Sequence, residues 1–134
     1  MIQRIQTVWL FLIAVLSGLS LFLPATERVN PEVASSFPFE MLFTIGNGIF
    51  FLFSVIIIFL YNNRPLQIKL SYGLLILLIL FSAMTVCYFW VSPAGSIIYK
   101  YPIVFHTIAI IFDLLAIHSI KKDEKLVRSL DRLR

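Results

Sequence analysis

The sequence contains few charged residues. Only 13% of its 134 residues are Asp, Glu, Lys or Arg, and 60% are hydrophobic. A soluble domain typically has about 25% charged and about 45–50% apolar residues. So small a share of charge would leave a soluble fold without enough polar surface to cover it. We therefore expect a protein whose surface faces the lipid bilayer.

Cysteine is scarce and the common catalytic motifs are missing. The single cysteine, Cys87, excludes an internal disulfide and lies in an apolar run, where a thiol usually packs as a small hydrophobic group. The sequence has no His-Glu-x-x-His, Gly-x-Ser-x-Gly, glycine-rich phosphate loop or Cys-x-x-Cys motif. Its two histidines, His106 and His118, are too far apart to bind one metal ion from a single helix. We expect no catalytic residue, no metal site and no cofactor.

Four stretches of the chain are apolar and long enough to cross a bilayer, which takes about 20 residues in a helix. Three of them contain no charged residue, and the fourth contains only Asp113. Proline, asparagine and glycine occupy the connections between them. We place four transmembrane helices in a single domain, at residues 6–24, 41–61, 70–91 and 102–120.

The connections between successive spans are short. They favour an all-α membrane protein in which the helices form an antiparallel, up-down-up-down bundle. Ala14 with Gly18, and Thr44 with Gly48, have the spacing that allows close contact between helices. Such pairs are common by chance, so they define no dimer interface.

The distribution of positive charge indicates how the helices are oriented. The net charge of +4 would raise the question of nucleic acid in a soluble protein. Here nine of the eleven Lys and Arg residues lie in the two chain ends and the turn at 62–69, and only Arg28 and Lys100 lie in the other two loops. Membrane proteins keep such residues on the cytoplasmic side. We expect a multi-pass inner-membrane protein with both termini cytoplasmic, loops 25–40 and 92–101 outside, and no nucleic-acid partner.

The first span also has features of a secretory signal, with Arg4 before an apolar core at 8–23. Its apolar run is long for a signal, and Leu23-Pro24-Ala25 is a poor cleavage site. We therefore expect this span to remain part of the protein.

Asp113 is the most informative residue of the spans, because a carboxylate in mid-bilayer costs at least about 2.5 kcal/mol on insertion scales. At a similar depth in the other helices lie three hydroxyl groups that could donate hydrogen bonds to it, those of Ser17, Ser54 and Ser82.

Two further polar residues, His106 and Asn47, are predicted near the outer end of the bundle. His106 precedes Asp113 by almost two helical turns on the same face, about 10 Å along the axis. Asn47 is expected at the depth of His106. One interpretation is a proton or solute path from His106 past Asp113 to His118. The other is a set of buried polar groups that fix helix register by hydrogen bonding, which the lack of a second acid or a basic partner favours.

Six of the fourteen residues at 121–134 are basic. On a helix, one face would be apolar and the opposite face would carry the basic row Lys121, Lys125, Arg128 and Arg132. This pattern predicts a short amphipathic cytoplasmic helix at the C-terminus, able to lie on anionic lipid headgroups or to dock on a partner. The alternative is a solvated extension of the fourth span that anchors the topology.

Both ends of the chain resemble the ends of proteins in a known family. The opening MIQRIQT and the closing DEKLVRS and DRLR resemble a family of small four-helix membrane proteins of unknown function, found mainly in Bacteroidetes. The similarity extends over the whole chain, but only the ends are specific. It implies membrane location and architecture, and it supplies no catalytic residues.

Both recognisable ends fall on the predicted cytoplasmic side. We therefore hypothesise a working surface there, in which Gln3, Arg4 and Gln6 meet the basic tail. One of the tail's acids, Asp123, Glu124 or Asp131, would pair with Arg4.

These features predict a non-enzymatic scaffold or accessory subunit, whose partner is another membrane protein or a second copy of the chain. The alternative is a small proton-linked carrier or transporter that uses Asp113. A lipid-modifying enzyme is third, and it would require His106 and Asp113 to converge with another polar group.

Overall fold

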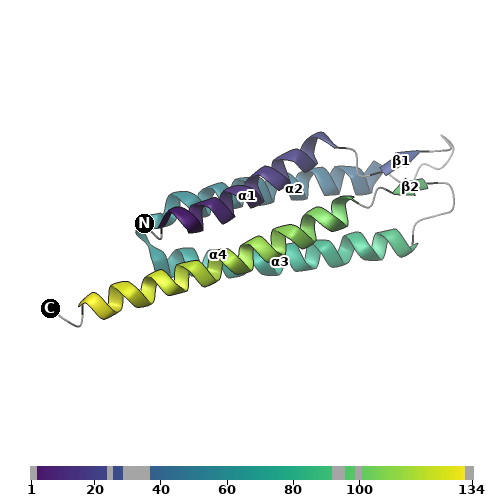
Figure 1. The fold of residues 1–134 in the computed structure, drawn as a ribbon. Coiled ribbons are helices and arrows are strands. Elements are labelled where there is room, and N and C mark those ends of the chain that lie inside the picture. The colour runs from purple at the N-terminus through teal and green to yellow at the C-terminus, as the bar shows by residue number, and fades with distance from the viewer. Residues whose placement is uncertain (1–2, 24–25, 29–36, 92–95, 99–100, 132–134) are drawn as a thin grey trace.

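The computed structural model contains four long helices and two short strands (Figure 1), and it describes residues 3–23, 26–28, 37–91, 96–98 and 101–131. The helices are α1 (Gln3–Phe22), α2 (Phe37–Phe59), α3 (Arg64–Val91) and α4 (Tyr101–Asp131). A 3-10 turn, η1 (Leu60–Asn62), joins α2 to α3. Strand β1 (Thr26–Arg28) pairs antiparallel with β2 (Ser96–Ile98), with Glu27 opposite Ile97.

All four helices are long and apolar enough to cross a membrane. The candidate spans are Ile5–Phe22, Phe39–Asn62, Arg64–Tyr88 and Ile103–Val127. The prediction of four helices that are long and apolar enough to span a membrane is therefore confirmed. The paired strands were not predicted; they lie in the two connections that the sequence indicated only as loops.

Helix α3 begins at Arg64, earlier than the third predicted span at residue 70. The Asn62-Asn63-Arg64-Pro65 segment belongs to the second of the connections in which the sequence predicts a break between helices. Proline is tolerated in the first turn, where its missing N–H would have no partner within the helix. The backbone N–H of Gln67 donates to the carbonyl oxygen of Asn63 at 2.9 Å, so the helix is already formed here.

The two ends of the bundle are formed by different elements. The η1 end comprises the start of α1, η1, the start of α3 and the last turns of α4. The strand end carries β1 and β2. Helices α1 and α4 run antiparallel, because the Tyr101 hydroxyl donates to the Leu23 carbonyl at the strand end and Gln6 contacts Ser119 at the η1 end. Helix α1 packs on α2 and α4, and α4 packs on α3, whereas α2 and α3 share few contacts.

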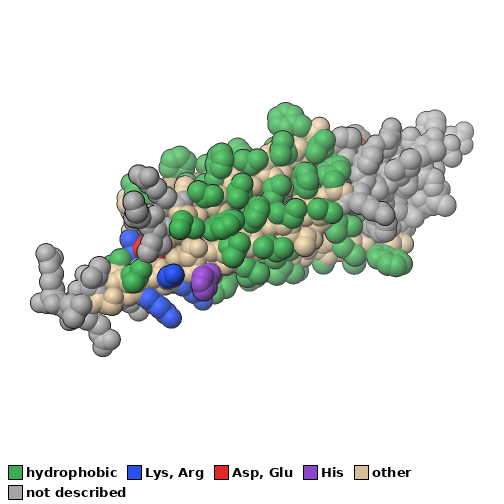
Figure 2. All heavy atoms as spheres, viewed as in Figure 1, with side chains coloured by type: hydrophobic (Ala, Val, Ile, Leu, Met, Phe, Trp, Pro, Cys, Tyr) green, Lys and Arg blue, Asp and Glu red, His purple; other side chains and the backbone are tan. Residues whose placement is uncertain are grey.

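Buried positions recur every three or four residues along α1, α2 and α4, and from Gln67 to Leu78 on α3, the spacing expected of packed helices. Among the described residues, eleven buried side chains are polar and thirteen are apolar. Many large apolar side chains also lie on the outside, including Phe22 (86% exposed) and Trp90 (81%). Figure 2 shows hydrophobic side chains covering the visible face of the bundle. This reverses the pattern of a soluble bundle and suits surroundings of hydrocarbon.

One close contact between α2 and α3 depends on glycine. A Cβ atom at Gly46 would overlap the ring of Phe81. That ring is held in place by Phe50 and His106, with centroid distances of 5.1 and 5.3 Å, and by Phe43 at 6.0 Å.

We expect Gly46→Ala to be less stable than Gly48→Ala by about 1–2 kcal/mol, because moving the Phe81 ring disturbs its aromatic contacts. Gly48 is the matched control, since a Cβ there meets only Leu21 at an ordinary 4.0 Å. Both variants gain the same helix propensity. Loss of helical circular dichroism during denaturation in detergent micelles measures the difference. Equal stabilities, or no rescue of Gly46→Ala by Phe81→Leu, would contradict this account.

Candidate functional site

Hydrogen bonds between helices gather at the η1 end. The side-chain amide of Gln6 on α1 donates to the carbonyl oxygen of Ser119 on α4 at 3.4 Å. The amide of Gln67 on α3 donates to the carbonyl oxygen of Ile57 on α2 at 3.2 Å. Both glutamine side chains are buried. Together they connect all four helices in two pairs.

An ion pair at the same end joins the start of α3 to α4. Arg64 Nη1 lies 3.1 Å from Asp123 Oδ2, and the two side chains are 24% and 11% exposed. Asp123 thus has a charged partner in Arg64, which sequence reasoning did not consider, and its pairing with Arg4 stays a prediction. The side chains of Gln3 and Arg4 lie outside the part that the structure describes.

The basic tail continues α4 without a break, so the expected separate C-terminal helix is instead part of one long helix. Lys121 is anchored: its ammonium donates to the Tyr72 hydroxyl and lies 4.9 Å from the centroid of that ring. Lys125 is exposed. The side chains of Arg128 and Arg132 lie outside the described residues. Figure 1 shows α4 reaching past the other helices, and Figure 2 shows Lys and Arg side chains gathered at this end.

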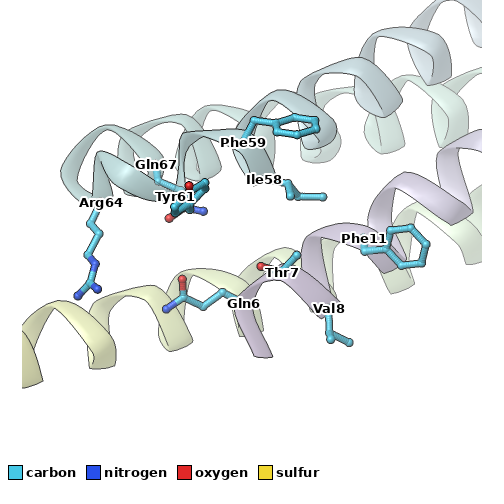
Figure 3. A pocket seen from close by; sticks show the side chains of 9 residues that line it. All are labelled: Gln6, Thr7, Val8, Phe11, Ile58, Phe59, Tyr61, Arg64 and Gln67. Carbon is cyan, nitrogen blue, oxygen red and sulfur yellow. The ribbon is translucent and has the colours of Figure 1, made fainter. Parts of the chain in front are cut away.

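A groove of about 630 Å³ opens at the η1 end, between α1 on one side and α2, η1 and α3 on the other (Figure 3). Its apolar lining consists of Val8, Phe11, Ile58 and Phe59. Its polar lining consists of Gln6, Thr7, Tyr61, Arg64 and Gln67. Figure 3 shows Arg64 and Gln67 towards one end of the groove and Phe11 at the other, so the lining changes from polar to apolar along its length.

Sequence reasoning missed this groove, although it singled out Gln6. Arg64 was used only as a topology signal, and Gln67 was not considered. A usable signal existed: Gln67 interrupts the start of an apolar helix three residues after Arg64, which places both on one helix face. The contribution of η1 had no such signal, because nothing in the sequence positions Tyr61 against α1.

The intramembrane candidates Asn47, His106 and Asp113 are all buried. The His106 ring lies edge-on to Phe43 and Phe50, at centroid distances of 5.7 and 6.1 Å. Those phenylalanines flank Asn47 by one turn on either side, so Asn47 and His106 lie at the same depth, as expected. The Asn47 amide donates to the Phe43 carbonyl of its own helix at 2.9 Å.

Asp113 is fully buried on the core-facing side of α4, between Ala109 and Ala116. Neither of its carboxyl oxygens has a hydrogen-bond partner within the described part of the chain. Two of the three expected donors bond their own helices instead: Ser54 donates to the Phe51 carbonyl at 2.9 Å and Ser82 to the Ile79 carbonyl at 2.8 Å. The expectation that these two serines compensate Asp113 is wrong.

A sequence model described as a domain of unknown function, DUF4293, matches residues 2–133. The chain belongs to the DUF4293 family. The match covers all four helices, both strands and most of the tail, so the groove and the buried polar residues are parts of the DUF4293 domain. No curated protein and no solved structure shows significant similarity to the chain. The resemblance seen at the chain ends is thus confirmed, and the function of this DUF4293 domain has to be argued from its geometry.

We expect Asp113→Leu to leave the free energy of unfolding unchanged within about 1 kcal/mol or to raise it, because replacing a buried carboxyl group that lacks hydrogen-bond partners costs no hydrogen bond. The matched control is Gln67→Met, which removes the bond to Ile57 and should cost about 1 kcal/mol. Denaturation in detergent micelles followed by circular dichroism compares the two. An Asp113→Leu variant less stable than Gln67→Met would show that Asp113 holds the bundle together.

Proposed function

We propose that this DUF4293 protein is a non-enzymatic scaffold or accessory subunit of the bacterial inner membrane, which binds a membrane-protein partner through its η1 end. The observation that carries the proposal is the extension of α4. Lys121 and Asp123 fasten the helix to α3. From Lys125 onward the same helix continues past these anchors, with Leu126 and Val127 exposed.

A helix fastened in this way presents its side chains at a fixed place, which lowers the entropy lost when a partner binds. Between Glu124 and Asp131, α4 rises by about 10 Å at 1.5 Å per residue. Exposed apolar and basic side chains on one helix suit a partner helix, a second copy of the chain or a surface of anionic lipid headgroups. We favour a protein partner because the rigid attachment fixes direction, which binding to a fluid lipid surface does not require.

The proposed orientation places the η1 end and both termini in the cytoplasm and the strand end outside. Arg64, Lys69, Lys121, Lys122 and Lys125 all belong to the η1 end, in keeping with the positive-inside rule. The antiparallel arrangement of α1 and α4 supports an up-down-up-down bundle in the membrane.

A second candidate is a small proton-linked carrier that uses Asp113. Its support is the full burial of this carboxyl group among apolar core residues, since ionisable groups inside membrane spans are functional more often than elsewhere. An Asp113→Asn variant that stays folded but loses the protein's activity in cells would favour the carrier over the scaffold.

Reporter fusions test the orientation. We expect alkaline phosphatase to be active when fused after residue 35 and inactive when fused after residue 63 or at the C-terminus, because the enzyme matures only outside the cytoplasm. A green fluorescent protein fused at the same three points should give the opposite pattern. Active phosphatase at the C-terminus would reverse the proposed direction of every helix.

Shortening α4 tests the partner surface. A chain that ends at Glu124 keeps the contacts of Gln6, Lys121 and Asp123, so it should insert and fold like the full chain while losing the captured partner. Affinity purification from native membranes in a mild detergent, followed by mass spectrometry, measures partner recovery.

The matched control carries a Gly/Ser segment of equal length in place of residues 125–134, which restores length without the side chains. The scaffold proposal fails if the shortened chain captures the same partner in the same amount. It fails equally if the full chain captures no protein in stoichiometric amount.

A further inference from the structure

The groove at the η1 end has the size and polarity of a binding site for an amphiphile. Its volume of about 630 Å³ falls within the range of about 300–1,000 Å³ typical of ligand pockets. Side chains of Val8, Phe11 and Phe59 form an apolar part whose members are all more than half exposed. At the other end the lining is polar, with Arg64 and Gln67 on the first turn of α3.

The depth of the groove matches this division. Arg64 and Gln67 lie next to η1, where α2 ends and α3 begins, whereas Phe11 lies further along α1 towards the middle of its span. Cationic and amide side chains are stable at the level of lipid headgroups, and phenylalanine is stable among acyl chains. A lipid molecule has the same order of polar and apolar parts along the same direction.

The positive charge of Arg64 favours a lipid with an anionic headgroup. Arginine has five N–H donors in a planar fork that suits phosphate oxygens, and Asp123 lies against Arg64 Nη1. An apolar partner helix in this groove would cover the partly exposed Arg64 guanidinium without pairing its remaining N–H groups, at a cost that a phosphate group avoids.

We propose that the groove binds one anionic phospholipid, with its phosphate at Arg64 and one acyl chain along Val8, Phe11 and Phe59. None of the lining residues lies in the tail at 121–134, so this site is distinct from headgroup binding by the tail. It is also independent of the partner surface proposed above.

Native mass spectrometry of the purified full chain, released from detergent in the presence of phosphatidylglycerol, tests the site. We expect one phosphatidylglycerol per chain at low lipid concentration and markedly less retention of zwitterionic phosphatidylcholine. Arg64→Gln should weaken phosphatidylglycerol binding by about tenfold, the loss expected for one charge-assisted contact. The control Lys69→Gln removes the same charge from an exposed position on α3 outside the groove and should change binding by less than about threefold.

A second pair of variants tests the apolar part. Thr7→Phe places a ring in the groove and should abolish the one-to-one complex, whereas Thr44→Phe adds the same ring at an exposed position of α2 and should leave it intact. Circular dichroism and gel filtration in detergent establish that each variant is folded.

Asp123→Asn separates a role of Arg64 in binding from a role in folding. If Arg64 contacts the phosphate, removing the competing carboxylate should tighten phosphatidylglycerol binding. If Arg64 acts only through its ion pair, Asp123→Asn should weaken binding as Arg64→Gln does, which would overturn the proposal.

Equal retention of the two lipids, equal effects of Arg64→Gln and Lys69→Gln, or displacement of the lipid by inorganic phosphate alone would also overturn it. The chain that ends at Glu124 should still bind the lipid, so this result stands apart from partner capture.

Discussion

Hydrocarbon offers no hydrogen-bond partners, and this constraint accounts for most of the structure. Many polar side chains in the spans are buried, and several hydroxyl groups bond their own helix. Ser20 donates to the Leu16 carbonyl and Thr85 to the Phe81 carbonyl, both at 2.9 Å. Such bonds satisfy the hydroxyl without joining one helix to another. Helix association inside the bilayer therefore rests mainly on packing, as where the Phe81 ring lies on Gly46.

Polar contacts between helices become favourable where the bilayer ends. At the η1 end the Gln6 and Gln67 amides and the Arg64–Asp123 pair connect neighbouring helices, and at the strand end Tyr101 bonds the Leu23 carbonyl. Side-chain packing thus stabilises the middle of the bundle, and hydrogen bonds and an ion pair stabilise its ends. Asp113 is the exception, because it places a carboxyl group in the apolar middle at a cost that no described donor offsets.

Hydropathy alone was enough to predict the four spans, because about 20 apolar residues in sequence have no other stable location than a bilayer. The depth of Asn47 and His106 could also be predicted, since helical rise converts residue number into distance. The start of α3 was placed too late because the apolar run without charge begins only after Lys69, whereas the helix already begins at Arg64. The two strands could not be predicted, since segments of three residues carry too little pattern and their pairing joins distant parts of the chain.

The partner of Asp123 shows why the candidate site was harder to predict than the fold. Sequence reasoning placed Arg4 and Arg64 on the same side of the membrane and considered only Arg4 as a partner for the acids of the tail. Choosing between them requires knowing which helix lies beside α4 at that level and at what angle, and hydropathy contains neither. The structure shows that the first turn of α3 lies beside α4. Arg64 thereby begins a helix, holds α4 through Asp123 and lines the groove. Of these three roles, none could be read from the sequence. The sequence shows only the positive charge of Arg64, which indicates the side of the membrane on which it lies.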